Sequence, residues 1–237
     1  MLILQKNSFK LNDEITNAGF AISLALIMLV FLIVPVILVM LGIVKYIPPL
    51  LHILLPSLLI IPGICITMYF VGKPGNLLRK FKMVDLHPNH ISVSFIATII
   101  VLFTAANVVY VYHKILKVFY IEIKPPPIEQ ILKGSDSISL WLMCFGIIVL
   151  APISEEIIFR RFIFAYLAAR GGFISAMLLT AGLFAVIHMS LYSLPALFLL
   201  GIGFQLIYLK FGSLYPAILM HSFNNAIAVA LLLFWEG

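Results

Sequence analysis

Residues 151–162 read A-P-I-S-E-E-I-I-F-R-R-F and place two glutamates and two arginines in a region that is otherwise almost entirely apolar. Of the 237 residues in the chain, 63% are hydrophobic and only 10% are charged. This composition is typical of a membrane protein with several spans and lies outside the range of soluble globular domains. The four charged side chains therefore lie either where a helix leaves the membrane or inside the membrane itself.

Runs without Asp, Glu, Lys or Arg extend from this stretch in both directions. A helix needs roughly 20 apolar residues to cross the hydrocarbon core of a bilayer, and each run meets this length. The longest run holds two crossings, because residues 190–195 include polar side chains and a proline, which favour a turn. We therefore predict an all-α fold, a polytopic transmembrane helix bundle with seven to eight membrane-spanning helices. The runs cover residues 18–44, 46–72, 91–112, 137–154, 171–209 and 211–235.

The runs predict a single membrane domain at residues 18–237, preceded by an N-terminal cytoplasmic segment at residues 1–17. The first run is too long for the core of a signal peptide and is followed by no small-residue cleavage site, so we expect it to be retained. With the N-terminus in the cytoplasm, ten of the 15 lysines and arginines lie on the cytoplasmic side. The positive-inside rule favours this orientation of an integral membrane protein.

The net charge of +6 does not indicate a nucleic-acid partner. No basic run is interleaved with aromatic residues, and the charges gather at the ends of the predicted spans. We expect membrane lipid to be a partner and nucleic acid not to be one. The sequence does not indicate an oligomeric state.

Two placements of Glu155 and Glu156 compete. In the first, the helix ends at Ser154 and the acids mark the membrane surface. In the second, the helix continues to the stop signal at Gly171 and Gly172, which places Glu155 roughly 22 Å from that turn. His188 on the returning helix then lies roughly 24 Å from the same turn. The second placement would bring a carboxylate and an imidazole together inside the membrane.

Helical spacing separates the roles of the charged residues. Glu156 and Arg160 are four residues apart with the acid first, which is the better order for an ion pair. Glu155 points about 100° away and has no such partner, so its carboxylate remains available to take a proton from water. Arg161 also lacks a partner in register, and its guanidinium either reaches the membrane surface or has a role inside the protein. Pro152 is expected to kink the helix one turn before the acids.

The last run contains H-S-F-N-N at residues 221–225, in which His221 and Asn225 share a helical face. Taken alone, each is more often a hydrogen-bonding contact between helices than a catalytic group. Polar groups inside a membrane are costly, and three such sites on three helices can satisfy one another around one cavity. This favours a shared polar site.

These residues resemble the CPBP intramembrane proteases, also called the type II CAAX prenyl protease and Abi family. The family motif EExxxR appears as E-E-I-I-F-R at residues 155–160, FxxxH as F-A-V-I-H at residues 184–188, and HxxxN as H-S-F-N-N. The resemblance implies a protease core at about residues 137–235. It implies that Glu155 activates water, that His188 assists it, and that His221 and Asn225 polarise the scissile carbonyl. It also implies that Glu156, Arg160 and Phe184 give structural support.

A metal is the least determined part of this site. Two imidazoles and a carboxylate form a known catalytic zinc set, so zinc is possible at Glu155, His188 and His221. No HExxH motif occurs, and the family, although often labelled a metalloprotease family, resembles a glutamate-dependent hydrolase. We expect no required metal or cofactor.

Three functions remain in competition at this point. The first is an intramembrane endopeptidase that hydrolyses a peptide bond in a membrane-tethered protein or peptide, with CAAX-type C-terminal processing as the best-known instance in the family. The second is a catalytically silent bacteriocin-immunity or membrane scaffold protein of the same fold. The third is a small transporter in which intramembrane Glu and His relay protons, although the chain shows no matching halves.

Overall fold

The computed structural model describes residues 87–234 without interruption, together with scattered positions between residues 17 and 58. Within this part of the chain all regular structure is helical, and no strand occurs. The elements are α2 (Val34–Met40), α5 (Pro88–Val118), α6 (Ile128–Lys133), α7 (Ser137–Phe145), η3 (Gly146–Leu150), α8 (Ala151–Glu156), η4 (Ile157–Phe164), α9 (Ala165–Gly171), α10 (Phe173–Ile187), α11 (Leu194–Phe211) and α12 (Leu214–Phe234).

One continuous helical rod carries the charged stretch. It runs over Ser137–Gly171 and consists of α7, α8 and α9 joined by the π-helical segments η3 and η4. Asp136 caps its first turn by accepting hydrogen bonds from the backbone N–H groups of Ile138 and Ser139, both at 3.1 Å. The helix therefore continues through Glu155 and Glu156, and the alternative that it ends at Ser154 is wrong.

Turns at the predicted positions return the chain through the bundle. Gly172 has φ 86°, a conformation that suits glycine, and it separates α9 from α10. The break predicted at residues 190–195 is confirmed, because α10 ends at Ile187 and α11 begins at Leu194. Gly212, with φ 63°, then ends α11 and leads into α12.

Four helices in the described part are long and apolar enough to cross a membrane: α5, the rod Ser137–Gly171, α11 and α12. The apolar helix α10 is shorter, with 15 residues. An all-helical membrane bundle is thus present, whereas the expected total of seven to eight spans is not confirmed. The runs at residues 18–44 and 46–72 lie largely outside the described residues, and so does nearly all of the N-terminal segment at residues 1–17.

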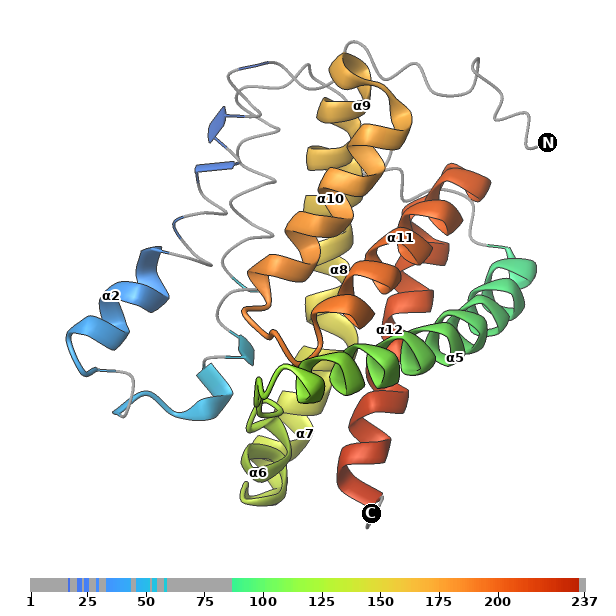
Figure 1. The fold of residues 1–237 in the computed structure, drawn as a ribbon. Helices are drawn as coiled ribbons and strands as arrows, with labels where there is room; N and C mark the ends of the chain where they lie inside the picture. The colour runs from blue at the N-terminus through green and yellow to red at the C-terminus, as the bar shows by residue number, and fades with distance from the viewer. Residues whose placement is uncertain are drawn as a thin grey trace.

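Helix α5 braces the C-terminal part of the bundle by crossing α11 and α12 (Figure 1). The Ser94 hydroxyl donates to the carbonyl of Pro216 at 2.9 Å, and the Thr98 hydroxyl lies 3.2 Å from the carbonyl of Met220. Small hydroxyl residues are common where membrane helices pack closely. Two polar contacts thus hold α12 in place beside α5.

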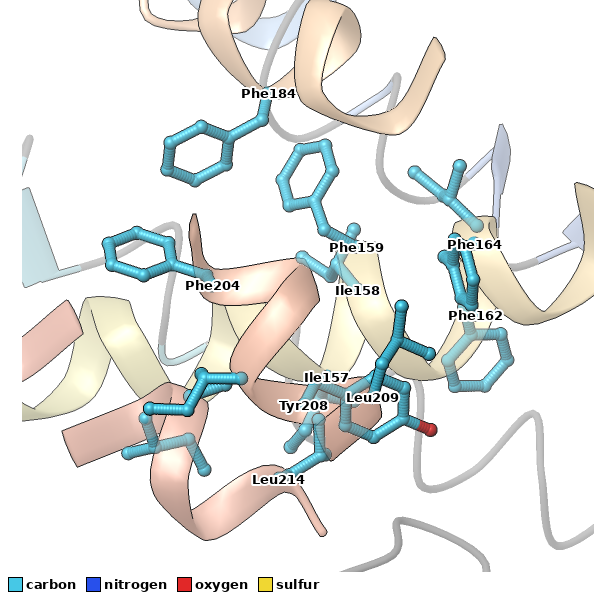
Figure 2. Close-up of a cluster of buried hydrophobic side chains, with 14 of the residues drawn as sticks. Ile157, Ile158, Phe159, Phe162, Phe164, Phe184, Phe204, Tyr208, Leu209 and Leu214 are labelled. Carbon is cyan, nitrogen blue, oxygen red and sulfur yellow. The ribbon is translucent and has the colours of Figure 1, made fainter. Parts of the chain in front are cut away.

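The core lies where η4, α10, α11 and α12 meet. Figure 2 shows Phe159, Phe184 and Phe204 pointing toward one another from three elements, and Phe159 and Phe184 pack edge to face with ring centroids 5.2 Å apart. Every residue of η4 is buried, including Arg161, which is only 2% exposed. The alternative in which Arg161 reaches the membrane surface is therefore wrong.

Candidate active site

The rod, α10 and α12 bring one carboxylate against two imidazoles. Glu155 Oε2 lies 3.9 Å from His188 Nε2 and 3.7 Å from His221 Nε2. The helix hairpin thus places Glu155 and His188 at the same depth, as their distances from Gly172 predicted. Both separations exceed a direct hydrogen bond and are of the size that a bridging water spans. Among the described residues, none donates a hydrogen bond to Glu155 Oε2, which is buried.

The contacts of each imidazole determine which nitrogen carries a proton. His188 Nδ1 lies 2.7 Å from the carbonyl oxygen of Phe184, and His221 Nδ1 lies 2.9 Å from Glu156 Oε1. A carbonyl and a carboxylate only accept hydrogen bonds, so Nδ1 is the donor in both rings. In a neutral ring, Nε2 then offers its lone pair toward Glu155. Both histidines therefore turn Nε2 toward the same carboxylate.

Glu156 connects this centre to a buried cation. Its Oε2 forms an ion pair with Arg160 Nε at 3.0 Å, which is the pair that the spacing predicted. Arg160 Nη2 also donates to the carbonyl of Gly201 on α11 at 3.0 Å. The sequence did not reveal that Glu156 also holds His221. A carboxylate on the far nitrogen of an imidazole fixes the tautomer and the orientation of the ring, as in catalytic triads.

Aromatic rings enclose the cation and the imidazoles. The Arg160 guanidinium lies 5.1 Å from the ring centroid of Phe184 and 5.2 Å from that of Phe204. Phe184 packs on His188 with centroids 4.7 Å apart, as its place one turn earlier predicted. Phe204 stacks on His221 at 4.5 Å with an interplanar angle of 18°. Sequence reasoning missed Phe204, because the spacing of residues within α11 does not show which of its faces packs against α12.

Asn225 lines the same cavity as His221, as their spacing predicted, but its amide already forms two hydrogen bonds. Its Nδ2 donates to the carbonyl of Ile147 at 2.8 Å, and its Oδ1 accepts from Asn224 Nδ2 at 3.0 Å. An amide nitrogen has two hydrogens, so one donor of Asn225 remains. Asn224 is a second lining residue that the motif did not single out.

A cavity of about 370 Å³ joins these groups. Its polar lining consists of the five side chains already described, namely Glu155, His188, His221, Asn224 and Asn225. The rest of its wall is apolar and comes from Ile128, Ile147, Ala151, Phe184, Leu197, Leu200, Phe204, Ala228, Val229 and Leu232. The polar chemistry is thus confined to one part of an otherwise apolar pocket.

The predicted alternative of a zinc ion requires closer ligands. Oxygen and nitrogen atoms bound to one tetrahedral zinc lie about 3.3 Å apart, because each bond is about 2.0 Å long. The separations of Glu155 from His188 and His221 are larger. Over residues 87–234 and the scattered described positions, no group of three His, Cys, Asp or Glu side chains is arranged to hold a metal ion. The residues as placed do not fit zinc.

Residues 137–227 match a family model described as type II CAAX prenyl endopeptidase Rce1-like. The matched segment contains all seven predicted site residues. No curated protein and no solved structure matches the chain.

Proposed function

Because residues 137–227 place this chain in the Rce1-like type II CAAX prenyl endopeptidase family, as its three motifs predicted, we propose that it is an intramembrane endopeptidase. It hydrolyses a peptide bond in a membrane-tethered protein or peptide with water activated by Glu155. The family implies a protease in an integral membrane protein. The glutamate mechanism, the substrate and a cytoplasmic N-terminus are parts of the proposal.

The attack on the peptide begins with one water molecule between Glu155 and His188. One hydrogen of the water bonds to Glu155 and the other to the lone pair of His188 Nε2, which directs the water oxygen at the scissile carbonyl carbon. As the C–O bond forms, Glu155 takes the proton. His188 thus orients the nucleophile, and its own ring is oriented by the Phe184 carbonyl.

The negative charge on the former carbonyl oxygen is stabilised by donors on α12. Protonated His221 donates from Nε2, while Glu156 balances the positive ring from the Nδ1 side. Asn225 supplies its remaining amide hydrogen. When the C–N bond breaks, Glu155 returns its proton to the leaving amine, so the carboxylate is regenerated.

The observation that carries this proposal is the position of the Glu155 carboxylate. It faces the oriented imidazoles of His188 and His221 and lines a cavity of about 370 Å³. The apolar walls suit apolar side chains on either side of the cleaved bond, and CAAX-type processing is one such reaction. The family match does not favour the alternative of a silent immunity or scaffold protein.

The test is cleavage of a prenylated C-terminal peptide by the purified protein in lipid nanodiscs. Glu155→Gln keeps the size of the side chain but removes the base, and we expect it to lower kcat by a factor of at least about 1,000. Glu122→Gln is the matched control, because Glu122 is exposed in the segment between α5 and α6. Retained cleavage in Glu155→Gln, or cleavage that a chelator abolishes, would overturn the mechanism.

A further inference from the structure

The helix around Ile147 leaves one carbonyl oxygen without a helical donor. In the π-helical segment η3, the Ala151 N–H donates to the carbonyl of Gly146, five residues back. Ala151 is the residue that would serve Ile147 in an α-helix. The next candidate, Pro152, lies five residues after Ile147 and has no N–H. The change of register and the proline together leave the Ile147 carbonyl in need of a donor from outside the helix.

That donor comes from α12. Asn225 Nδ2 lies 2.8 Å from the Ile147 oxygen. Because a carbonyl oxygen only accepts, the end of the Asn225 amide that faces it is the nitrogen. The other end, Oδ1, accepts from Asn224 Nδ2 at 3.0 Å. The orientation of both amides therefore follows from the single acceptor at the helix break.

We propose that Asn224 is a positioning residue that acts through Asn225. By donating to Oδ1, it prevents the Asn225 amide from turning over. One hydrogen of Asn225 Nδ2 thus stays on Ile147, and the second stays available to the oxyanion. This inference rests on the proposed function, since it assigns Asn225 a donor role in hydrolysis. The same contacts tie the rod that carries Glu155 to the helix that carries His221.

Asn224→Asp tests the proposal with almost no change in shape. A carboxylate cannot donate to Asn225 Oδ1, and it attracts Asn225 Nδ2 away from Ile147. Loss or displacement of one oxyanion donor lowers kcat by on the order of 100-fold, and we expect KM to stay within about threefold. Asn224→Gln, which keeps the amide donor, should recover part of this loss. Asn89→Asp, at an exposed position in the first turn of α5, is the control for the added charge.

The decisive comparison uses the Asn225→Ala background. If Asn224 acts through Asn225, adding Asn224→Asp to Asn225→Ala leaves kcat unchanged within about twofold. The inference would be overturned if the fold-losses in kcat of the two single variants multiplied in the double variant. It would also be overturned if Asn224→Asp alone kept the kcat of the wild type. In either case the proposed function would still stand.

A wild-type protein that cleaves no peptide would refute the proposed function instead. Thermal unfolding in detergent of the wild type, Asn224→Asp, Asn225→Ala and the double variant then tests whether Asn224 and Asn225 interact. A lower melting temperature in each single variant, with no further drop in the double variant, supports the Asn224 to Asn225 contact. Additive shifts would refute it.

Discussion

Two acid–base pairs in this chain have the same spacing and opposite surroundings. Glu129 and Lys133 on α6 are four residues apart, with an N–O distance of 2.8 Å and side chains 50% and 42% exposed. Glu156 and Arg160 have the same spacing and a distance of 3.0 Å, but their side chains are 0% and 1% exposed. Spacing alone thus predicts both pairs and says nothing of what either one does.

The surroundings determine the energetic role of each pair. Water screens the pair on α6, and such surface pairs contribute little to stability. The pair in the core is surrounded by aromatic rings, a backbone carbonyl and His221 in place of water. A buried charge without its partner is very unfavourable, so the core pair is needed even if its net contribution is small. Its function is to hold His221.

The largest expected effect comes from breaking the core pair on one side only. Glu156→Gln leaves the buried Arg160 cation without its adjacent carboxylate; neutral acceptors, the aromatic ring faces and the more distant Glu155 carboxylate remain. We expect the free energy of unfolding to fall by about 3 to 5 kcal/mol. Equilibrium unfolding in detergent measures this, and peptide cleavage should be lost in the same variant, because the His221 ring loses its anionic partner.

The double variant Glu156→Gln/Arg160→Met separates charge from shape. It removes both charges and keeps an apolar chain between Phe184 and Phe204, so we expect it to recover most of the lost stability but not the activity. A double variant as unstable as Glu156→Gln would show that the cost comes from packing and not from an uncompensated charge.

An intermediate effect is expected at Asp136, an exposed acid whose contacts are with a helix end and not with a cation. Hydrogen bonds from the side chain and backbone of Ser139 hold the pKa of Asp136 below its usual value. Since the folded state lowers the pKa, its stabilising contribution is present above the unfolded-state pKa and is lost as the pH falls through the folded-state pKa. Asp136→Ala should therefore melt below the wild type at about pH 6, and the gap should close toward about pH 3. A gap that is constant with pH would contradict this origin.

The features that sequence reasoning predicted depend on distances along one helix. The Glu156–Arg160 pair follows from spacing, and the meeting of Glu155 with His188 follows from helical rise counted from the turn at Gly172. Both hold even though Arg160 lies in the π-helical segment η4, which also separates Glu155 from the turn at Gly172. Local geometry was sufficient for these contacts.

The features that it missed depend on how helices pack sideways. Phe204 reaches His221 because α11 lies beside α12, and Ser94 and Thr98 brace α12 from α5, which looked like an ordinary span. Asn224 gains a role only because the π-helical register and Pro152 leave the Ile147 carbonyl without a donor. The spacing of residues within one run does not predict contacts between helices. For the same reason, the sequence left open whether Arg161 reaches the membrane surface.

The smallest expected effect is at the exposed pair, where Glu129→Gln sharpens the comparison with Glu156→Gln. The two substitutions are chemically the same, and each removes the acid of a pair with four-residue spacing. At the surface, the lysine regains full hydration when its partner is lost, so the free energy of unfolding should change by only about 0.3 to 0.5 kcal/mol.

High salt should reduce even this difference, because exposed charges are screened over about 10 Å at roughly 0.1 M salt. A loss comparable to that of Glu156→Gln in parallel unfolding experiments would mean that α6, whose Ile128 lines the cavity, is held in place by this pair. In that case, burial would not determine how much stability each of the two ion pairs contributes.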